Sequence, residues 1–81
     1  MSFVVYLLSC ADRSLYCGYT NDIATRVTKH NAGKASKYTR SRLPVRLVHK
    51  EKFSTQREAM QREAFIKKLS RKKKLELVKG N

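Results

Sequence analysis

Two short apolar runs, residues 3–9 (FVVYLLS) and 15–20 (LYCGYT), constrain the fold of this chain most strongly. Both are rich in β-branched and aromatic residues, and the polar stretch between them is typical of a hairpin turn. A turn centred on Ala11 would place Tyr6 directly across from Tyr16, with Gly18 on the same face of the hairpin. Taken alone, two tyrosines on neighbouring strands indicate cross-strand aromatic packing more often than a catalytic role.

A helix is expected directly after the second run. Asp22 is a favourable N-cap residue, and Ile23, Val27 and His30 repeat at helical spacing. Arg26 falls on the edge of this stripe, one turn before His30, so its guanidinium is expected near the buried face. Two ordinary alternatives stay open: the Arg26 head group reaches water, and the histidine interacts with the end of the helix dipole.

Residues 34–44 (KASKYTRSRLP) are expected to form a loop between this helix, which should end around Asn31, and a third strand over residues 45–53. Basic side chains alternate in the loop with tyrosine and hydroxyl residues, the types that contact phosphates and stack on bases. A solvated basic loop without such a role is the alternative. The candidate nucleic-acid contacts are Lys37, Tyr38, Thr39, Arg40 and Arg42.

A second helix is expected after Thr55, which is spaced from Glu58 as a capping box. Further along this helix, Glu63 falls inside the apolar stripe that contains Ile66. A carboxylate at such a position must be protonated, paired with a cation such as Arg26 or a lysine, or bound to a metal. Pairing is the most common of the three in proteins, so the position alone does not establish a metal site.

A last short helix is expected after Ser70, with Leu75 and Val78 able to pack at i, i+3 spacing. The run of cations at its start is typical of a solvated face, and an extension of a phosphate-binding track is the other interpretation. Together these elements indicate an α+β domain in which a small sheet of three strands is flanked by helices. A length of 81 residues allows one domain, 1–81, with one modest core.

The charge balance indicates a polyanionic partner. The chain has 19 Lys and Arg against 6 Asp and Glu, a net charge of +13. DNA is the first candidate, with RNA as the other, because neutralising phosphates releases condensed counterions. A membrane surface is disfavoured, since the last helix lacks the aromatic-rich apolar face of an interfacial anchor. No signal peptide or spanning segment is recognisable, so a cytoplasmic location is expected.

Cys10 and Cys17 lie in or beside the first hairpin, and no further cysteine accompanies them to build a zinc site. In a reducing compartment, free thiols are the simplest expectation.

One set of spacings matches a known family: V-Y at 5–6, Y-C-G at 16–18, and then Arg26 and His30-Asn31. This pattern resembles the GIY-YIG nuclease domain over nearly the whole chain, in the small stand-alone form of uncharacterised bacterial proteins and of the nuclease subunit of structure-specific DNA resolvases. A-x-x-x-E-x-x-x-K at residues 59–67 matches the family's metal-binding helix. Two departures keep strand propensity: Val4-Val5 replaces the first Gly-Ile, and Cys17 replaces the second Ile.

The resemblance implies a mostly antiparallel three-stranded sheet in the order β-β-α-β-α-α, and phosphodiester hydrolysis assisted by one divalent ion. Glu63 would hold Mg²⁺ or Mn²⁺, while Arg26 would neutralise charge on the phosphorus centre. Tyr6 would act as general base or orient the attacking water, and Tyr16 would position the phosphate or that water. His30 would serve as a relay or phosphate contact. The same family helix places Lys67 among the nucleic-acid contacts.

Three functions follow as hypotheses: a metal-dependent DNA endonuclease of repair or recombination, a non-catalytic nucleic-acid-binding module with the same fold, and a basic protein attracted to membranes. The first is favoured, because binding alone has no need of a carboxylate on a buried stripe. The chain shows no linker or tail for the separate recognition module that many relatives of this nuclease carry. A separate recognition subunit is therefore a candidate partner.

Overall fold

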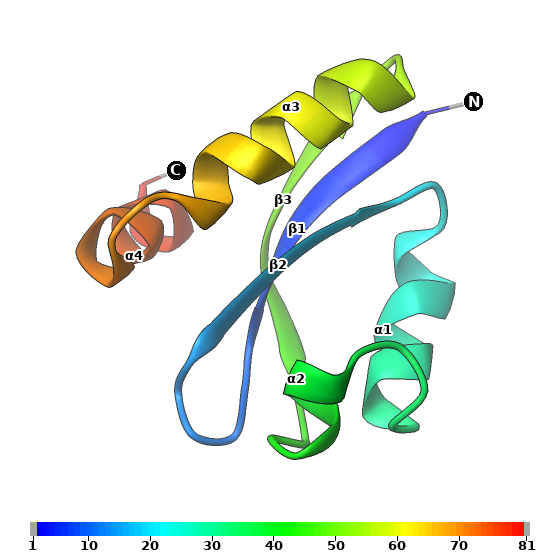
Figure 1. Ribbon diagram of the computed structural model, residues 1–81, viewed down its shortest axis with the longest axis vertical. Coiled ribbons are helices and arrows are strands. Elements are labelled where there is room, and N and C mark those ends of the chain that lie inside the picture. The colour runs from blue at the N-terminus through cyan, green and yellow to red at the C-terminus, as the bar shows by residue number, and fades with distance from the viewer. Residues whose placement is uncertain (1, 81) are drawn as a thin grey trace.

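A computed structural model describes residues 2–80, so Met1 and Asn81 of the expected domain lie outside the described part. Three strands form one antiparallel sheet in the spatial order β2-β1-β3, and four helices accompany it (Figure 1). The expected α+β fold and antiparallel sheet are confirmed. The elements are β1 (Phe3–Ser9), β2 (Leu15–Thr20), α1 (Ile23–Asn31), α2 (Lys37–Arg40), β3 (Arg46–Phe53), α3 (Gln56–Lys67) and α4 (Arg71–Lys79).

The central strand β1 is buried on both faces, which explains its unbroken apolar sequence. Because side chains alternate along a strand, Val5 and Leu7 pack with Ile66 of α3, whereas Tyr6 and Leu8 belong to the cluster on the α1 side. Figure 1 shows the sheet running between α1 and α2 on one side and α3 and α4 on the other. The sheet therefore separates two distinct cores.

The register of the β1–β2 hairpin differs from the expected one. Tyr6 lies opposite Gly18, and Tyr16 lies opposite Leu8, so the expected direct pair of tyrosines is wrong. The turn is centred on Asp12 and not on Ala11, because the backbone N–H of Cys10 donates to the carbonyl of Ser14 at 2.9 Å. A shift of two residues keeps the side-chain faces, so the phenols still share one side of the sheet.

The helix caps agree with the sequence. Side-chain oxygens of Asp22, Thr55 and Ser70 accept backbone N–H donors at the starts of α1, α3 and α4. The last helix packs differently from the expectation, however. Val78 packs against the α3-side core as expected. The other residue of α4 that packs there is Leu77 and not Leu75, which remains 37% exposed.

The segment between α1 and β3 is better ordered than the expected loop. It contains α2, whose N-cap residue Ser36 accepts a hydrogen bond from the backbone N–H of Tyr38. Asn31 closes the segment at its base: its Nδ2 donates to the carbonyl of Val45 at 3.0 Å, and its Oδ1 accepts from the Val45 N–H at 2.8 Å. This pair of bonds imitates a strand ladder and fixes both ends of residues 32–44.

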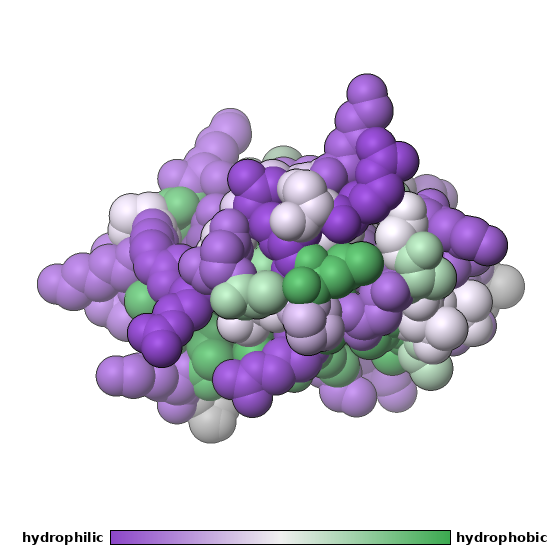
Figure 2. Space-filling view, turned by 90° about the horizontal axis from the view of Figure 1, so that it is seen from below, coloured by the Kyte–Doolittle hydropathy of each residue, from purple (hydrophilic) through white to green (hydrophobic). Residues whose placement is uncertain are grey.

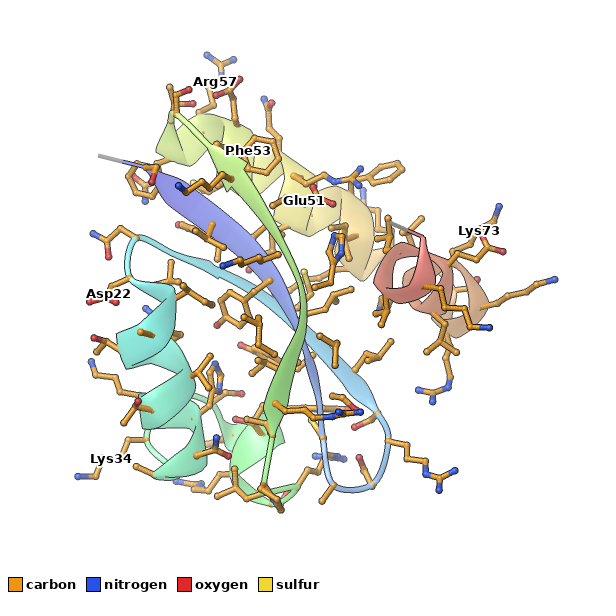
Figure 3. All side chains as sticks on the ribbon, turned by 180° about the vertical axis from the view of Figure 1, so that it is seen from behind. Asp22, Lys34, Glu51, Phe53, Arg57 and Lys73 are labelled. Carbon is orange, nitrogen blue, oxygen red and sulfur yellow. The ribbon has the colours of Figure 1, made fainter. Side chains whose placement is uncertain are left out.

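On the α3 side, Glu51 ties the edge strand β3 to the helix. Both of its carboxylate oxygens accept from Arg62, at 2.8 and 3.0 Å, and Oε2 also contacts His49 Nε2 at 2.8 Å. Figure 3 shows Glu51 between β3 and α3. The Arg62 guanidinium is the main cause that lowers the pKa of this carboxyl. The network is structural, and it gives His49 a partner where the sequence suggested no role.

Cys10 and Cys17 are both buried free thiols, as expected. None of the helices described within residues 2–80 combines the length and apolar composition needed to cross a membrane.

Candidate active site

Tyr6 reaches the site across a glycine. Gly18 lies opposite it on the edge strand β2, and a Cβ at position 18 would stand 2.5 Å from the Tyr6 hydroxyl and 2.8 Å from the ring carbon that carries it. Contacts this short do not occur in folded proteins, so the phenol can lie over β2 only because residue 18 has no side chain. Gly18 therefore positions the Tyr6 hydroxyl at the edge of the sheet.

A chain of buried hydrogen bonds extends inward from Tyr6. The Tyr6 hydroxyl lies 3.0 Å from His30 Nε2, His30 Nδ1 lies 2.8 Å from Thr39 Oγ1, and that hydroxyl donates to the carbonyl of Ser36 at 3.4 Å. Since the Thr39 proton is directed to Ser36, the Thr39 oxygen accepts from Nδ1–H of the histidine. The network thus assigns the Nδ1–H tautomer to His30 and makes Nε2 the acceptor of the Tyr6 proton.

Burial keeps the Tyr6 phenol and the His30 imidazole neutral at pH 7. It raises the pKa of Tyr6 to about 12, with the neighbouring Tyr16 adding to the rise and the Arg26 cation opposing it. Burial also lowers the pKa of His30, and Arg26 lowers it further. A neutral imidazole facing a protonated phenol is a resting donor–acceptor pair, in which the histidine can accept the phenolic proton.

Aromatic rings fix Tyr16 beside this chain. Its ring centroid lies 6.5 Å from that of Tyr6, 5.2 Å edge-on from that of His30, and 5.9 Å from that of Tyr38, on which it stacks. On Tyr38, the Arg42 guanidinium lies 3.9 Å from the ring centroid. The α2 segment therefore braces Tyr16 through ring contacts, and Tyr38 is a structural neighbour of the site as well as a candidate base contact.

Tyr6, Tyr16, Arg26 and Glu63 line a hollow along β2, between α1 and α3, with a volume of about 410 Å³. We call it the edge hollow. His30, the other expected catalytic residue, does not line it and is buried, so it can act there only through Tyr6. Arg26 enters from α1 and Glu63 from α3. Residues from opposite faces of the sheet therefore meet at its β2 edge. The lining consists of Phe3, Tyr6, Tyr16, Gly18, Tyr19, Thr20, Asn21, Arg26, Gln56 and Glu63.

Glu63 has a partner in this arrangement. Its Oε2 lies 3.6 Å from Lys67 Nζ, and its side chain is 20% exposed. Of the possibilities open from the sequence, pairing with a lysine is the one observed, and within residues 2–80 Arg26 forms no ion pair. A contact of 3.6 Å to a half-exposed lysine is a weak ion pair, which leaves the carboxylate able to bind another cation.

The donor set of the edge hollow fits a hard divalent cation held mainly by water and substrate. No cluster of three or more His, Cys, Asp or Glu side chains suited to a metal occurs within residues 2–80. Glu63 supplies a carboxylate to the hollow. Mg²⁺ commonly binds proteins through one or two carboxylates plus substrate phosphates, so one such oxygen donor beside an arginine suits a metal-bound phosphate.

The expected nucleic-acid contacts differ in their surroundings, and one of them, Lys67, is the partner of Glu63 on α3. Lys37, Arg40 and Tyr38 are exposed on α2. Thr39, in contrast, is fully buried with its hydroxyl on the His30 ring, so the expectation that it contacts phosphate is wrong for this geometry. Arg42 pairs with Asp12 at 3.0 Å and so joins α2 to the hairpin loop. Figure 2, which views this end of the molecule, shows a largely hydrophilic surface with small separate apolar patches.

Sequence reasoning missed the roles of three residues in or beside the site. Thr39 fixes the histidine tautomer, and Gln56 lines the edge hollow while donating to the Tyr19 hydroxyl at 3.1 Å. Asn31 closes the α2 segment against β3. The resemblance pattern contained Asn31 without a role. The sequence marked Thr39 only as a candidate nucleic-acid contact, and nothing in the local sequence marked Gln56.

Comparisons with known proteins show the family of this chain. A family model described as the GIY-YIG catalytic domain matches residues 2–76. A UPF0213 protein of Bacillus licheniformis is 62% identical over 73 residues, covering 90% of this chain and 75% of that protein. A UPF0213 protein of Natronomonas pharaonis is 58% identical over 74 residues, covering 91% of this chain and 87% of that protein.

Two solution NMR structures share the fold. The UPF0213 protein BH0048 from Bacillus halodurans is 49% identical, with a TM-score of 0.63 over 98% of this chain and 84% of that chain. The protein EF2693 from E. faecalis is 46% identical, with a TM-score of 0.66 over the same shares of 98% and 84%.

Proposed function

Because the chain belongs to the GIY-YIG catalytic domain family, we propose that it is a divalent-metal-dependent endonuclease that hydrolyses phosphodiester bonds in DNA, in repair or recombination. The observation that carries the proposal is the edge hollow. It brings two phenols, a guanidinium and a carboxylate from β1, β2, α1 and α3 around a single space. The net charge of +13 supports a nucleic-acid substrate.

Each side chain has a distinct role in this proposal. Arg26 neutralises the negative charge that develops on the phosphoryl oxygens, and Tyr16 orients the phosphate. Tyr6 takes a proton from the attacking water as its own phenolic proton passes to His30 Nε2, which already accepts a hydrogen bond from it. A Mg²⁺ or Mn²⁺ ion held by Glu63 would supply positive charge at a phosphate oxygen.

The high pKa of Tyr6, about 12, predicts when the base is active. At pH 7 the resting phenol is protonated, so Tyr6 can accept a proton from water only as its own proton leaves for His30 Nε2, a transfer that the positive charge of Arg26 and of a bound cation would favour. Cleavage is therefore expected to rise with pH through the lowered pKa of His30, as the imidazole becomes neutral, and to level off above it.

A binding module without catalysis is the second candidate, and the resting site gives it support. The Glu63–Lys67 pair and the Tyr6–His30–Thr39 hydrogen bonds give Glu63, Tyr6 and His30 partners without any ligand. A protein that only binds nucleic acid would have no further requirement for these groups. This candidate predicts salt-sensitive binding that needs no metal.

The decisive test is cleavage of labelled single-stranded, duplex, flap and branched DNA, and of RNA, in Mg²⁺, Mn²⁺ or EDTA. Glu63→Gln removes the metal-binding charge with little change in shape, and Glu76→Gln in the exposed last helix is the matched control. We expect cleavage to fall at least about 100-fold in Glu63→Gln and to stay near the wild-type rate in the control. Cleavage at the wild-type rate by Glu63→Gln contradicts the metal role. Binding without cutting by every protein supports the second candidate.

A further inference from the structure

A second hollow lies on the α4 side of the sheet, near the hairpin loop. Its volume is about 410 Å³, and it shares no lining residue with the edge hollow. Arg13 enters it from the hairpin loop, Arg46 from the first position of β3, and Arg71 from the first position of α4. We call this site the arginine hollow. Three segments far apart in the sequence thus bring guanidinium groups to one space.

No acidic side chain in the described part of the chain lines the arginine hollow. None of the ion pairs formed within residues 2–80 involves Arg13, Arg46 or Arg71. The first turn of α4 contains no acidic residue, so the positive end of the helix dipole adds to the three cations. Like charges gathered around one hollow repel one another, and a bound anion removes that repulsion.

The backbone at Arg13 gives an independent reason to look for a role of its side chain. Its φ of 69° lies in the left-handed region, which favours glycine or asparagine over residues with longer side chains. The loop holds this conformation by a hydrogen bond from the Arg13 N–H to the carbonyl of Cys10 at 2.9 Å. Glycine would suit this backbone better, so the arginine offers the fold a guanidinium at a conformational cost.

The floor of the arginine hollow is apolar. Leu15 of β2, Val48 of β3, and Leu75 and Val78 of α4 line it. On the left of Figure 2, where the hairpin loop and α4 lie, extended hydrophilic side chains project around apolar surface. Charged groups around an apolar floor suit a ligand with an anionic group joined to a flat, weakly polar one.

A nucleotide within a single strand has this composition. Guanidinium groups pair bidentately with phosphate oxygens, and an unpaired base or its sugar can cover apolar side chains, which the stacked bases of a duplex cannot do. We propose that the arginine hollow binds a backbone phosphate of single-stranded nucleic acid, with the adjoining nucleotide on the apolar floor. The proposal rests on the proposed function only in taking nucleic acid as the polyanion. It adds that a preferred substrate carries an unpaired strand.

The test measures binding without cleavage. Full-length Glu63→Gln protein in EDTA is titrated against fluorescein-labelled oligothymidylate, by anisotropy, over a range of salt concentrations. In the same background, Arg13→Gly, Arg46→Gln and Arg71→Gln are combined. The matched control combines Lys29→Gln, Lys34→Gln and Lys52→Gln, which remove the same charge from exposed positions outside both hollows. Circular dichroism and thermal melting verify that each protein is folded.

We expect the arginine variant to bind at least about tenfold more weakly than the control and with a shallower salt dependence. A third protein with lysine at positions 13, 46 and 71 should recover only part of the loss, because lysine cannot form the bidentate contact. Equal binding by the arginine variant and the control would overturn the proposal. Should the arginine variant fail to fold, the lysine variant decides alone: binding equal to that of the Glu63→Gln parent overturns the proposal.

Two further outcomes separate this site from related ideas. Vesicles with anionic lipid are the second probe, and loss of vesicle binding with unchanged oligothymidylate binding would overturn the nucleic-acid assignment. The assay also stands apart from catalysis. If the wild-type protein never cuts DNA but the arginine variant loses binding, the binding site is supported and the endonuclease proposal fails. If the wild-type protein cuts DNA but the arginine variant binds as well as the control, the endonuclease proposal is supported and the binding site fails.

Discussion

The two faces of the sheet bury side chains to a similar extent but of different chemistry. On the α3 side, Val5, Leu7 and Ile66 are fully buried and purely apolar. On the α1 side, Tyr6 and His30 are buried almost as completely, but their polar atoms form a hydrogen-bonded chain. Strand β1 supplies both faces through its alternation. One strand therefore contributes to an apolar core and to a hydrogen-bonded polar one, on opposite faces of the sheet.

The difference has an energetic consequence. An apolar core loses stability in proportion to the volume that is removed, whereas a buried polar network loses it whenever one partner is left unsatisfied. Within residues 2–80, every buried side-chain nitrogen and oxygen has a hydrogen-bond partner. Substitutions on the α3 side should thus affect stability, and those on the α1 side should affect activity out of proportion to stability.

The largest effect on stability is expected for Ile66→Ala. Removing this fully buried side chain should cost about 2–5 kcal/mol of unfolding free energy, measured by urea denaturation. Met60→Ala on the same helix, where the side chain is 49% exposed, is the control and should cost less than about 0.5 kcal/mol. A loss below about 1 kcal/mol for Ile66→Ala would mean that the α3 side is not the stabilising face.

Gly18→Ala should affect activity more than stability. The added Cβ would collide with the Tyr6 hydroxyl, so the phenol must move; cleavage should fall about 100-fold, and stability by about 1–3 kcal/mol. Cleavage kinetics and urea denaturation measure the two effects. In a Tyr6→Phe background the stability cost of Gly18→Ala should shrink, because the closest colliding atom is absent. An undiminished stability cost would show that Gly18 is needed for the backbone conformation and not for the space that the Tyr6 hydroxyl occupies.

Thr39→Val tests the inner end of the hydrogen-bonded chain. Valine keeps the shape of threonine but leaves the Nδ1–H of His30 without an acceptor, which should cost about 1–3 kcal/mol and slow cleavage about tenfold. Thr39→Ser keeps the hydroxyl and is the control. Nitrogen NMR shifts of the imidazole report the tautomer directly. If His30 has the same tautomer in the valine variant, threonine does not select it.

The smallest expected effect is a pH dependence of stability. The pKa of His30 is lowered in the folded protein, so the folded state binds fewer protons than the unfolded one. Stability from the neutral imidazole is then fully present above the ordinary histidine pKa of about 6.5, and is lost as pH falls through the lowered value. Urea denaturation between neutral and mildly acidic pH should show this decline. Since His49 is present in both proteins, a decline of equal size in His30→Gln would contradict the assignment to His30.

Much of the fold followed from sequence because local signals were strong. Strand alternation, the caps at Asp22, Thr55 and Ser70, and the family motifs predicted every element except α2. The short α2 escaped prediction because four residues give no periodicity. The hairpin register escaped for another reason: β1 is buried on both faces, so a shift of two residues leaves the hydrophobic pattern unchanged.

The candidate catalytic residues that line the edge hollow could be predicted from the sequence, but the hydrogen bonds behind them could not. Motif spacing placed Tyr6, Tyr16, Arg26 and Glu63 correctly at one hollow, although their catalytic roles stay predictions. The burial of Thr39 against His30 depends on how α2 folds back onto α1, a tertiary contact with no local signature. Hydroxyl residues in a basic segment are normally exposed, and this led to the wrong assignment for Thr39.

The paired amide bonds of Asn31 to Val45 also bear on how this fold can be altered. By holding both ends of residues 32–44 together, they fix the distance that the segment must span. Loop-closure entropy rises only slowly with length once the ends are fixed. Residues added to the segment outside α2 should thus cost little closure entropy, while α2 keeps its contacts with His30 and Tyr16.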